Sequence, residues 1–329
     1  MSIIARTFSF IRSRGPGMGC SALLFASCIA AGASAQATPT QAPPKPPPYS
    51  LPWQLRPAAI ATVLRSDTAF ASYKNPTSGK SGSTIASMLL GSFKVTPEFA
   101  PLVRLGAVSN DPPEGSKTPA GVTLQEHASF INPLIGGTYL FKLSPQLRLA
   151  AFVGMTVPVG DGGGDSPGPS TAAANAAGIY ARSAMDNAMF AVDYFTVLPG
   201  LDLAYVAGGL TVQLEATLLQ LWRVRSTKML QPDDSRTNFT AGLHVGYFFI
   251  PQLSIGAELR HQRWLSTPTA VAKDSSLRDT TTVAIGLRAH FKLSETAWLR
   301  PGIAYARGLD DPMDAREYNI VQLDVPVSF

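Results

Sequence analysis

Histidine is the side chain best suited to acid–base or metal chemistry at neutral pH, and this sequence of 329 residues contains four. They stand far apart, at His127, His244, His261 and His290. His261 lies in the polar run 260–264 and His127 follows Glu126, but no nucleophile with a local signature accompanies either one. A lone histidine is more often a polar lining residue than a catalytic base. We therefore expect no enzyme, no metal site and no cofactor.

Charged side chains are regularly spaced in several segments of the sequence, because they alternate there with apolar residues. In residues 210–224, Leu214 and Leu218 lie on one face of an extended chain, and Glu215 lies on the other. Such a period of two predicts a β-strand with one apolar and one polar face. The same alternation is strict in residues 147–159 and 283–293.

Nine further segments share this character, which makes twelve predicted strands. They are residues 53–63, 85–95, 101–107, 131–143, 197–207, 239–249, 253–259, 299–305 and 321–329. Short and long connections alternate between the twelve strands. The short ones are 96–98, 144–146, 208–209, 251–252 and 294–296, and the long polar ones are 74–83, 110–128, 160–193, 226–236, 266–279 and 310–317. An all-β, up-and-down antiparallel transmembrane β-barrel has this order, with turns at one end and loops at the other.

The composition agrees with a membrane barrel. Charged residues make up only 15% of the chain, and the mean hydropathy is slightly positive at +0.11. After the N-terminal region no run of about 18 apolar residues exists, so helical membrane spans are not expected. The formal net charge of +5 falls to near +2 without Arg6, Arg12 and Arg14, which is too weak a charge to indicate nucleic acid as a partner.

The N-terminus has the three parts of a secretory signal: the basic region, an apolar core and the small residues Ala33-Ser34-Ala35. We predict a signal peptide over residues 1–35, cleaved near Ala35, and a proline-rich periplasmic linker over residues 36–50. The barrel is predicted over residues 51–329. The alternative for the N-terminus is a lipoprotein acylated at Cys28.

The last predicted strand carries a specific resemblance. Its apolar row is Val321, Leu323, Val325, Val327 and Phe329. This stretch resembles the closing strand of bacterial outer-membrane β-barrel proteins, which typically end in Phe. The resemblance implies the outer membrane of a Gram-negative bacterium, contact with lipid and lipopolysaccharide, and recognition of the Phe329 strand by the barrel-assembly machinery.

A second resemblance concerns residues 131–139 and the following 149–160. Their Asn-Pro strand and Pro-Val-Gly strand end resemble outer-membrane transporters associated with aromatic-compound degradation. This resemblance implies passive uptake of small molecules.

The polar faces of the predicted strands would line a lumen in which basic residues prevail. The candidate lumen and selectivity residues are Arg56, Lys94, Arg104, Lys142, Arg148, Glu215, Arg223, Arg225, Glu258, Arg260, Arg288, Lys292 and Arg300, and the acidic Asp202 and Asp324 join them. A lining of one sign selects solutes of the opposite sign. We predict a porin-like channel for passive passage of small polar or anionic solutes. The alternatives are a structural or surface-interaction barrel whose plugged interior has paired charges, and a barrel-embedded hydrolase.

The longest connection, residues 160–193, begins with a Gly/Asp run and continues into an alanine-rich part free of proline. We expect a short helix there, capped by Ser170 or Thr171. A loop of this length usually has a function. It would either fold into the lumen as a constriction or lie outside as a lid.

Overall fold

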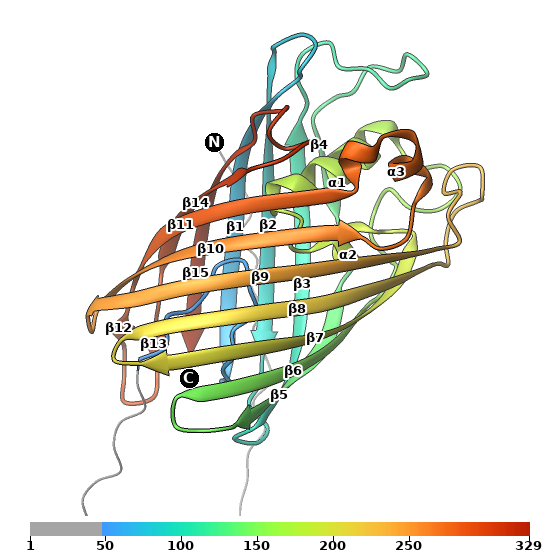
Figure 1. Ribbon diagram of the computed structural model, residues 1–329. Helices are drawn as coiled ribbons and strands as arrows, with labels where there is room; N and C mark the ends of the chain where they lie inside the picture. The colour runs from blue at the N-terminus through green and yellow to red at the C-terminus, as the bar shows by residue number, and fades with distance from the viewer. Residues whose placement is uncertain (1–47) are drawn as a thin grey trace, which may run out of the picture. The chain divides into compact units, whose positions relative to one another are not determined.

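The computed structural model describes residues 48–329, which form a closed antiparallel β-barrel (Figure 1). The strands are β1 (Val63–Lys74), β2 (Ser81–Ser92), β3 (Phe99–Asp111), β4 (His127–Phe130), β5 (Leu134–Lys142), β6 (Leu147–Thr156), β7 (Tyr194–Ala207), β8 (Leu210–Arg223), β9 (Ser235–Ile250), β10 (Leu253–Trp264), β11 (Asp279–Ala289), β12 (Phe291–Lys292), β13 (Trp298–Leu299), β14 (Gly302–Gly308) and β15 (Asn319–Ser328). Pairing between β1 and β15 closes the sheet, so its first and last strands have no free edge.

These strands make a barrel of twelve, as the sequence predicts. Three of the twelve are interrupted, so each of these three carries two of the fifteen strand labels. β4 and β5 both pair with β3, and Pro133 lies in the break between them. β13 and β14 both pair with β15, and Pro301 lies in that break. Proline has no N–H to donate to the ladder, which explains these two interruptions. The third separates β11 from β12 at His290.

The apolar rows of the strands face outward, as predicted. Leu214 and Ile285 are 52% and 54% exposed on the outer wall, whereas Glu215 and Arg288 are 4% and 1% exposed inside. A barrel in lipid has this polarity, because its outer face meets hydrocarbon while its interior is polar. None of the helices among residues 48–329 is long and apolar enough to cross a bilayer.

The short turns and long loops also lie where the sequence predicts them, at opposite ends of the barrel (Figure 1). One strand is placed wrongly by the sequence. The first strand is Val63–Lys74, not residues 53–63. Its outer face mixes Leu64 and Phe70 with Ser66, Thr68 and Ser72, so its alternation is weak, and the proline-flanked segment before it gave a false pattern.

Two segments fill the interior. The N-terminal segment, residues 48–62, enters the lumen, where Trp53, Gln54 and Leu55 are almost fully buried. The lumen loop, residues 157–193 between β6 and β7, folds inward and contains α1 (Pro169–Ala181) and α2 (Asn187–Phe190). Of the two predicted positions for this loop, the structure has the one inside the barrel. A third helix, α3 (Thr269–Lys273), and a 3-10 turn, η1 (Ser275–Leu277), lie in the loop after β10.

Helix α1 confirms the predicted helix but not its cap. It begins at Pro169, with Gly168 as N-cap and no side-chain cap. Proline suits the first turn of a helix, because its fixed φ is helical and its missing N–H is not needed there. The helix ends before Ser183 and Ala184, whose φ angles are 53° and 54°. Residues 1–47, which include the predicted signal peptide, its cleavage site and most of the predicted linker, lie outside the described residues.

Candidate functional site

The N-terminal segment is held in the lumen mainly through its backbone. The carboxylate of Glu258 accepts hydrogen bonds from the backbone N–H groups of Trp53 and Gln54, each at 2.7 Å. Glu215 accepts one from the N–H of Arg56 at 2.7 Å. Because a buried N–H without a partner costs free energy, these carboxylates replace the strand pairing that the segment lacks.

The phenol of Tyr49 is also anchored inside the barrel. It donates to Gln213 and accepts from the N–H of Ala58. Burial raises the pKa of Tyr49 well above its usual value, although the hydrogen bond from Ala58 opposes this. The phenol therefore remains a donor at neutral pH, and it attaches the start of the N-terminal segment to β8.

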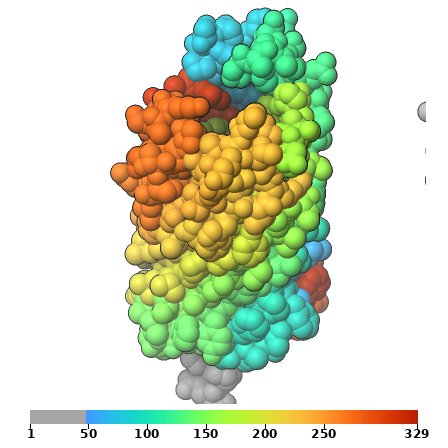
Figure 2. Space-filling view, turned by 90° about the vertical axis from the view of Figure 1, so that its right-hand side faces the viewer, coloured from blue at the N-terminus to red at the C-terminus, as the bar shows by residue number. Residues whose placement is uncertain are grey.

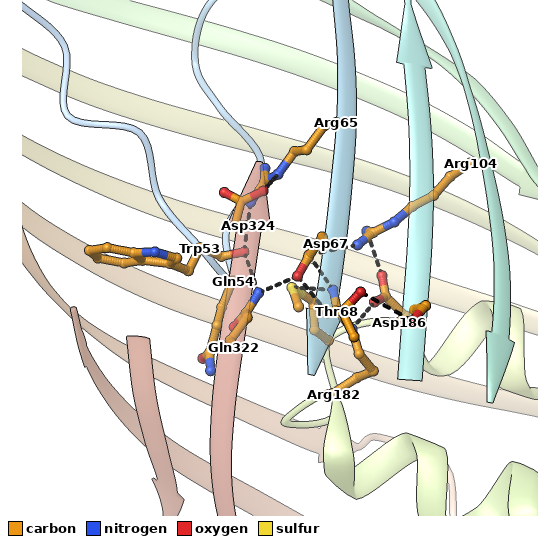
Figure 3. A network of polar contacts seen from close by, with 12 residues as sticks. Trp53, Gln54, Arg65, Asp67, Thr68, Arg104, Arg182, Asp186, Gln322 and Asp324 are labelled. Atoms are coloured by element: carbon orange, nitrogen blue, oxygen red, sulfur yellow. Dashed lines mark hydrogen bonds and ion pairs between the residues drawn. The ribbon is translucent and has the colours of Figure 1, made fainter. Parts of the chain in front are cut away.

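The lumen loop is held by a network of buried charges (Figure 3). Arg182 donates two parallel hydrogen bonds to Asp67 of β1, at 2.8 and 2.6 Å, and a third to Asp186 at 3.0 Å. Arg104 of β3 donates to Asp186 at 2.6 Å. Burial lowers the pKa of Arg182, but the attraction of Asp67 and Asp186 outweighs it and leaves the pKa raised. Arg182 is thus permanently charged, and its bidentate contact with Asp67 fixes the loop to the barrel wall.

The same network also contacts the N-terminal segment. Gln322 of β15 donates to Asp67 at 2.8 Å. Arg65 of β1 donates to Asp324 at 2.7 Å and to the carbonyl of Trp53 at 3.0 Å, and Arg288 also donates to Asp324. Because Asp67 and Arg65 both lie on β1, this strand connects the lumen loop with the N-terminal segment (Figure 3).

Between the two interior segments lies a cavity of about 90 Å³, here called the central cavity. One part of its lining is charged and comes from the network described above, together with Arg56, Glu215 and Arg260. The other part is apolar and is made by Met88, Leu90, Leu102, Leu134, Phe152, Leu198 and Leu219. A molecule inside it would therefore meet both an apolar and a polar lining.

A second cavity of about 330 Å³, here called the vestibule, lies at the loop end of the barrel. Its lining includes Tyr180 of α1, Trp264 of β10 and Val271 of α3. Figure 2 shows a recess at this end, between the orange segment that contains α3 and the gold loop after β8, two segments that contribute to the lining.

Residues 185–191 separate the two cavities, and we call them the septum. Met185 and Met189 line the central cavity, whereas Asn187 and Phe190 line the vestibule. The backbone carbonyl of Met185 accepts from Arg260 at 3.2 Å. The septum is therefore a thin wall that is attached by polar contacts, not by a strand ladder.

Six of the predicted lumen residues come together in this interior. They are Arg56, Arg104, Glu215, Glu258, Arg260 and Arg288, and the acidic Asp202 and Asp324 are buried beside them. The predicted excess of one sign is not found among them. Each of these arginines contacts a carboxylate, as in the pairs Arg56–Asp202 and Arg260–Glu215.

The other seven predicted lumen residues lie toward the barrel ends. Lys94 and Lys142 are exposed near the tight turns, and Lys292 pairs with Glu295 of its own turn. Arg148 and Arg300 are partly buried and stack on Tyr49 and Trp298. At the loop end, Arg223 pairs with Asp234, and Arg225 donates to the carbonyls of Pro158 and Gly160 and so fastens the lumen loop.

Sequence reasoning missed four central residues of the network. Arg65 and Asp67 lie on the strand that was placed ten residues too early. Arg182 and Asp186 lie in the lumen loop, where no periodicity indicates a direction. An arginine and an aspartate at i, i+4 after a buried helix was the one available signal, because such a pair faces one side of a helical turn.

Two of the four histidines, His244 and His290, lie buried in the interior. His244 is fully buried and contacts Glu258 at 2.9 Å, and His290 contacts Ser254 at 2.9 Å. His261 contacts Thr281 on the outer side near the loop end, and His127 is exposed on β4.

Comparison with known proteins agrees with the fold. No family model and no curated protein matches the chain. Among solved structures, the COG4313 outer membrane channel from Pseudomonas putida F1 is similar at 14% identity and a TM-score of 0.52, over 84% of this chain and 98% of that chain. The KdgM porin in complex with disordered oligogalacturonate and the NanC porin show 11% and 10% identity, with TM-scores of 0.44 and 0.46. Each covers 81% of this chain, and 99% and 98% of its own.

An identity of 14% supports the fold alone. With the closed sheet and the outward apolar rows, this likeness confirms the resemblance on which the sequence analysis relied. The chain has the fold of outer-membrane β-barrel channels.

Proposed function

We propose that the protein is a passive channel for small solutes in a bacterial outer membrane, and that its closed state is the one described here. The observation that carries this proposal is the pair of cavities inside a closed barrel, separated only by the septum. A solute would pass from the vestibule to the central cavity when the septum moves. The solute would leave the central cavity toward the tight-turn end when the N-terminal segment moves aside.

The membrane location rests on the outer surface of the barrel. Apolar side chains such as Leu214, Leu218 and Ile285 cover it, and a protein in water rarely exposes so large an apolar surface. Contact with lipopolysaccharide at the loop end, recognition of the Phe329 strand by the assembly machinery, and cleavage near Ala35 remain part of this proposal.

A preference for anions would require basic residues without acidic partners along the lumen. The interior arginines contact carboxylates, and paired charges create a much smaller field for a passing ion than a ring of one sign. Among the described residues that were predicted to line the lumen, five contact no carboxylate: Lys94, Lys142, Arg148 and Arg300 near the tight turns, and Arg225 at the loop end. We therefore assign selectivity mainly to the shape and lining of the two cavities.

A plugged structural barrel is the second candidate, because the N-terminal segment is so firmly bound inside. Planar-bilayer conductance distinguishes the two. The channel proposal expects discrete conductance steps for the purified full chain and a reversal potential that reports any preference for anions. A complete lack of conductance, also after removal of the septum contacts by Arg182→Met, would leave the structural barrel.

Hydrolase activity is the third candidate and has the least support. His244, His261 and His290 contact carboxylate or hydroxyl groups of the wall, and His261 contacts the hydroxyl of Thr281 at 3.0 Å. We propose that the protein is not an enzyme. An ester-hydrolysis assay that compares the wild type with His261→Ala tests this, since a histidine-dependent activity would contradict it.

A further inference from the structure

Four buried neutral polar side chains lie on the septum and on the inward face of the neighbouring strands β9 and β10, and we call them the neutral ladder. They are Asn187 of the septum, Asn238 and Thr240 of β9, and Gln262 of β10, all at least 94% buried. Gln262 and Thr240 are direct cross-strand partners. Asn187 and Gln262 line the vestibule, and Thr240 lines the central cavity. The neutral ladder therefore spans the boundary between the two cavities.

The hydrogen bonding of the neutral ladder is incomplete. Asn187 Nδ2 donates to Gln262 Oε1 at 2.8 Å. Within residues 48–329, no partner exists for Asn187 Oδ1, Gln262 Nε2, Thr240 Oγ1 or either polar atom of the Asn238 amide. Reversing both amides of the Asn187–Gln262 pair would again leave one donor and one acceptor.

Such a cluster is unusual for a purely structural wall. Native proteins pair the great majority of their buried polar atoms, because an unpaired one loses its hydration without compensation. The apolar side chains Leu219 and Leu221 of β8 face the same interior, so apolar residues would be compatible with the position. The unpaired donors and acceptors are therefore suited to a guest that passes along β9 and β10.

The chemistry of the neutral ladder defines this guest. Its four side chains offer donors and acceptors but no charge, which suits hydroxyl groups, because each hydroxyl both donates and accepts. An ionised group would lose its hydration there without a counter-charge from the ladder. The adjoining vestibule adds the rings of Tyr180, Phe190, Tyr194 and Trp264, which offer apolar faces to a ring-shaped solute.

We propose that the neutral ladder is the recognition site for a neutral polyhydroxylated solute, of the class of a monosaccharide, on its way past the septum. This inference rests on the proposed channel function and names its solute class. In the closed state the septum covers the ladder. When α2 moves away, the hydroxyl groups of the solute replace the contact between Asn187 and Gln262. The vestibule, at about 330 Å³, has room for such a molecule.

The test measures solute flux into proteoliposomes that contain the full-length protein. The probes are radiolabelled glucose and radiolabelled glucuronate, which share a ring but differ in charge. We expect glucose to pass about tenfold faster, because the carboxylate must be desolvated at a neutral ladder. KCl conductance of the same preparation shows separately whether the channel is open.

The key variant combines Asn238→Leu with Gln262→Leu and removes most of the unpaired atoms. It is expected to lower glucose flux by about tenfold relative to the KCl conductance of the same preparation. The matched control is Gln231→Leu. Gln231 also lines the vestibule, but its Oε1 already accepts from Arg236 at 2.8 Å, so glucose flux should not change.

The outcomes separate this inference from the channel proposal. Equal fluxes of glucose and glucuronate, or a double variant with wild-type glucose flux, would overturn the neutral ladder while KCl conductance upholds the channel. No flux and no conductance in the wild type would overturn the channel itself. If the double variant does not fold, Thr240→Val removes one hydroxyl at nearly constant volume. It should lower glucose flux by roughly threefold, and unchanged flux would contradict the inference.

Discussion

At the scale of single residues, Arg182 is the most connected charge of the interior. Its guanidinium contacts Asp67 on the barrel wall and Asp186 in the septum, and all three side chains are nearly fully buried. A buried ion pair adds little stability relative to apolar packing, but removal of one partner leaves an unpaired buried charge. The consequence is that Arg182 fixes the position of the lumen loop more than it adds to the stability of the barrel.

Arg182→Met removes this attachment and leaves the two carboxylates without their main partner. We expect the free energy of unfolding to fall by about 3–5 kcal/mol in urea titrations, and bilayer recordings to show a higher open fraction. Arg263→Met is the control, because Arg263 is exposed and pairs with Asp279 at 3.2 Å. Its effect should stay within about 0.5 kcal/mol.

Addition of Asp67→Asn to Arg182→Met should recover part of the lost stability, because it removes one unpaired charge. A double-mutant cycle measures this coupling. Simple additivity of the two changes would mean that Arg182 and Asp67 do not act together, contrary to their two parallel hydrogen bonds.

At the scale of elements, Glu258 is the carboxylate that accepts the most backbone hydrogen bonds from the N-terminal segment. Glu258 accepts from two consecutive backbone N–H groups and contacts His244, so both of its oxygens are in use. Glutamine has only one acceptor oxygen. Glu258→Gln therefore leaves Trp53 or Gln54 with an unpaired N–H and weakens the hold on the whole segment.

We predict that Glu258→Gln exposes the N-terminal segment transiently. The measurement is maleimide labelling of Ser50→Cys, a position that is only 1% exposed. Labelling should be roughly tenfold faster when Glu258→Gln is added, since a hydrogen bond to a charged group contributes about 1.5–3 kcal/mol. Glu98→Gln, in an exposed turn, serves as the control. Equal labelling rates for both variants would show that Glu258 does not hold the segment.

The packing of α1 depends on the small side chain at Gly178. A Cβ atom there would lie 2.3 Å from Cε1 of Phe190 and 3.0 Å from Val108 of β3. Gly178→Val should therefore cost about 1–3 kcal/mol through overpacking, seen as a lower urea midpoint. Ala173→Val, on a less buried part of the same helix, should change the midpoint much less. A midpoint for Gly178→Val equal to that of the control would contradict the close packing of α1 on α2.

At the scale of the whole molecule, the outer apolar surface decides in which medium the protein folds. Leu218 faces outward near the middle of β8, whereas Val224 lies just beyond its end. In lipid, an arginine on the outer face costs about 2–4 kcal/mol near the bilayer midplane and about 0–1 kcal/mol near the interfaces. Leu218→Arg should therefore destabilise folding into lipid bilayers more than Val224→Arg. Equal effects would speak against a membrane position of this surface.

The sequence predicts the wall of the barrel better than its contents. Alternation in residues 210–224 and 283–293 places Glu215 and Arg288 inside correctly, because side-chain direction in a strand follows from local periodicity. It fails for residues 63–74, where serine and threonine share the outer face with Leu64 and Phe70. The predicted lumen residues are therefore found in the interior where their strand is regular, whereas Asp67 and Arg182 could not be found in this way.

By itself, the sequence determined the closed twelve-strand barrel, the outward apolar rows, and the ends at which turns and loops lie. The strands, their two faces and the turns depend on neighbours within about ten residues, which a period of two and turn-forming residues make visible. Closure then follows, because an open sheet edge cannot lie in lipid. Only the tertiary structure decided what occupies the lumen. Arg182 meets Asp67 across 115 residues and Trp53 meets Glu258 across 205, and no local pattern encodes contacts at such separations. The septum, the two cavities and the neutral ladder all result from those long-range contacts.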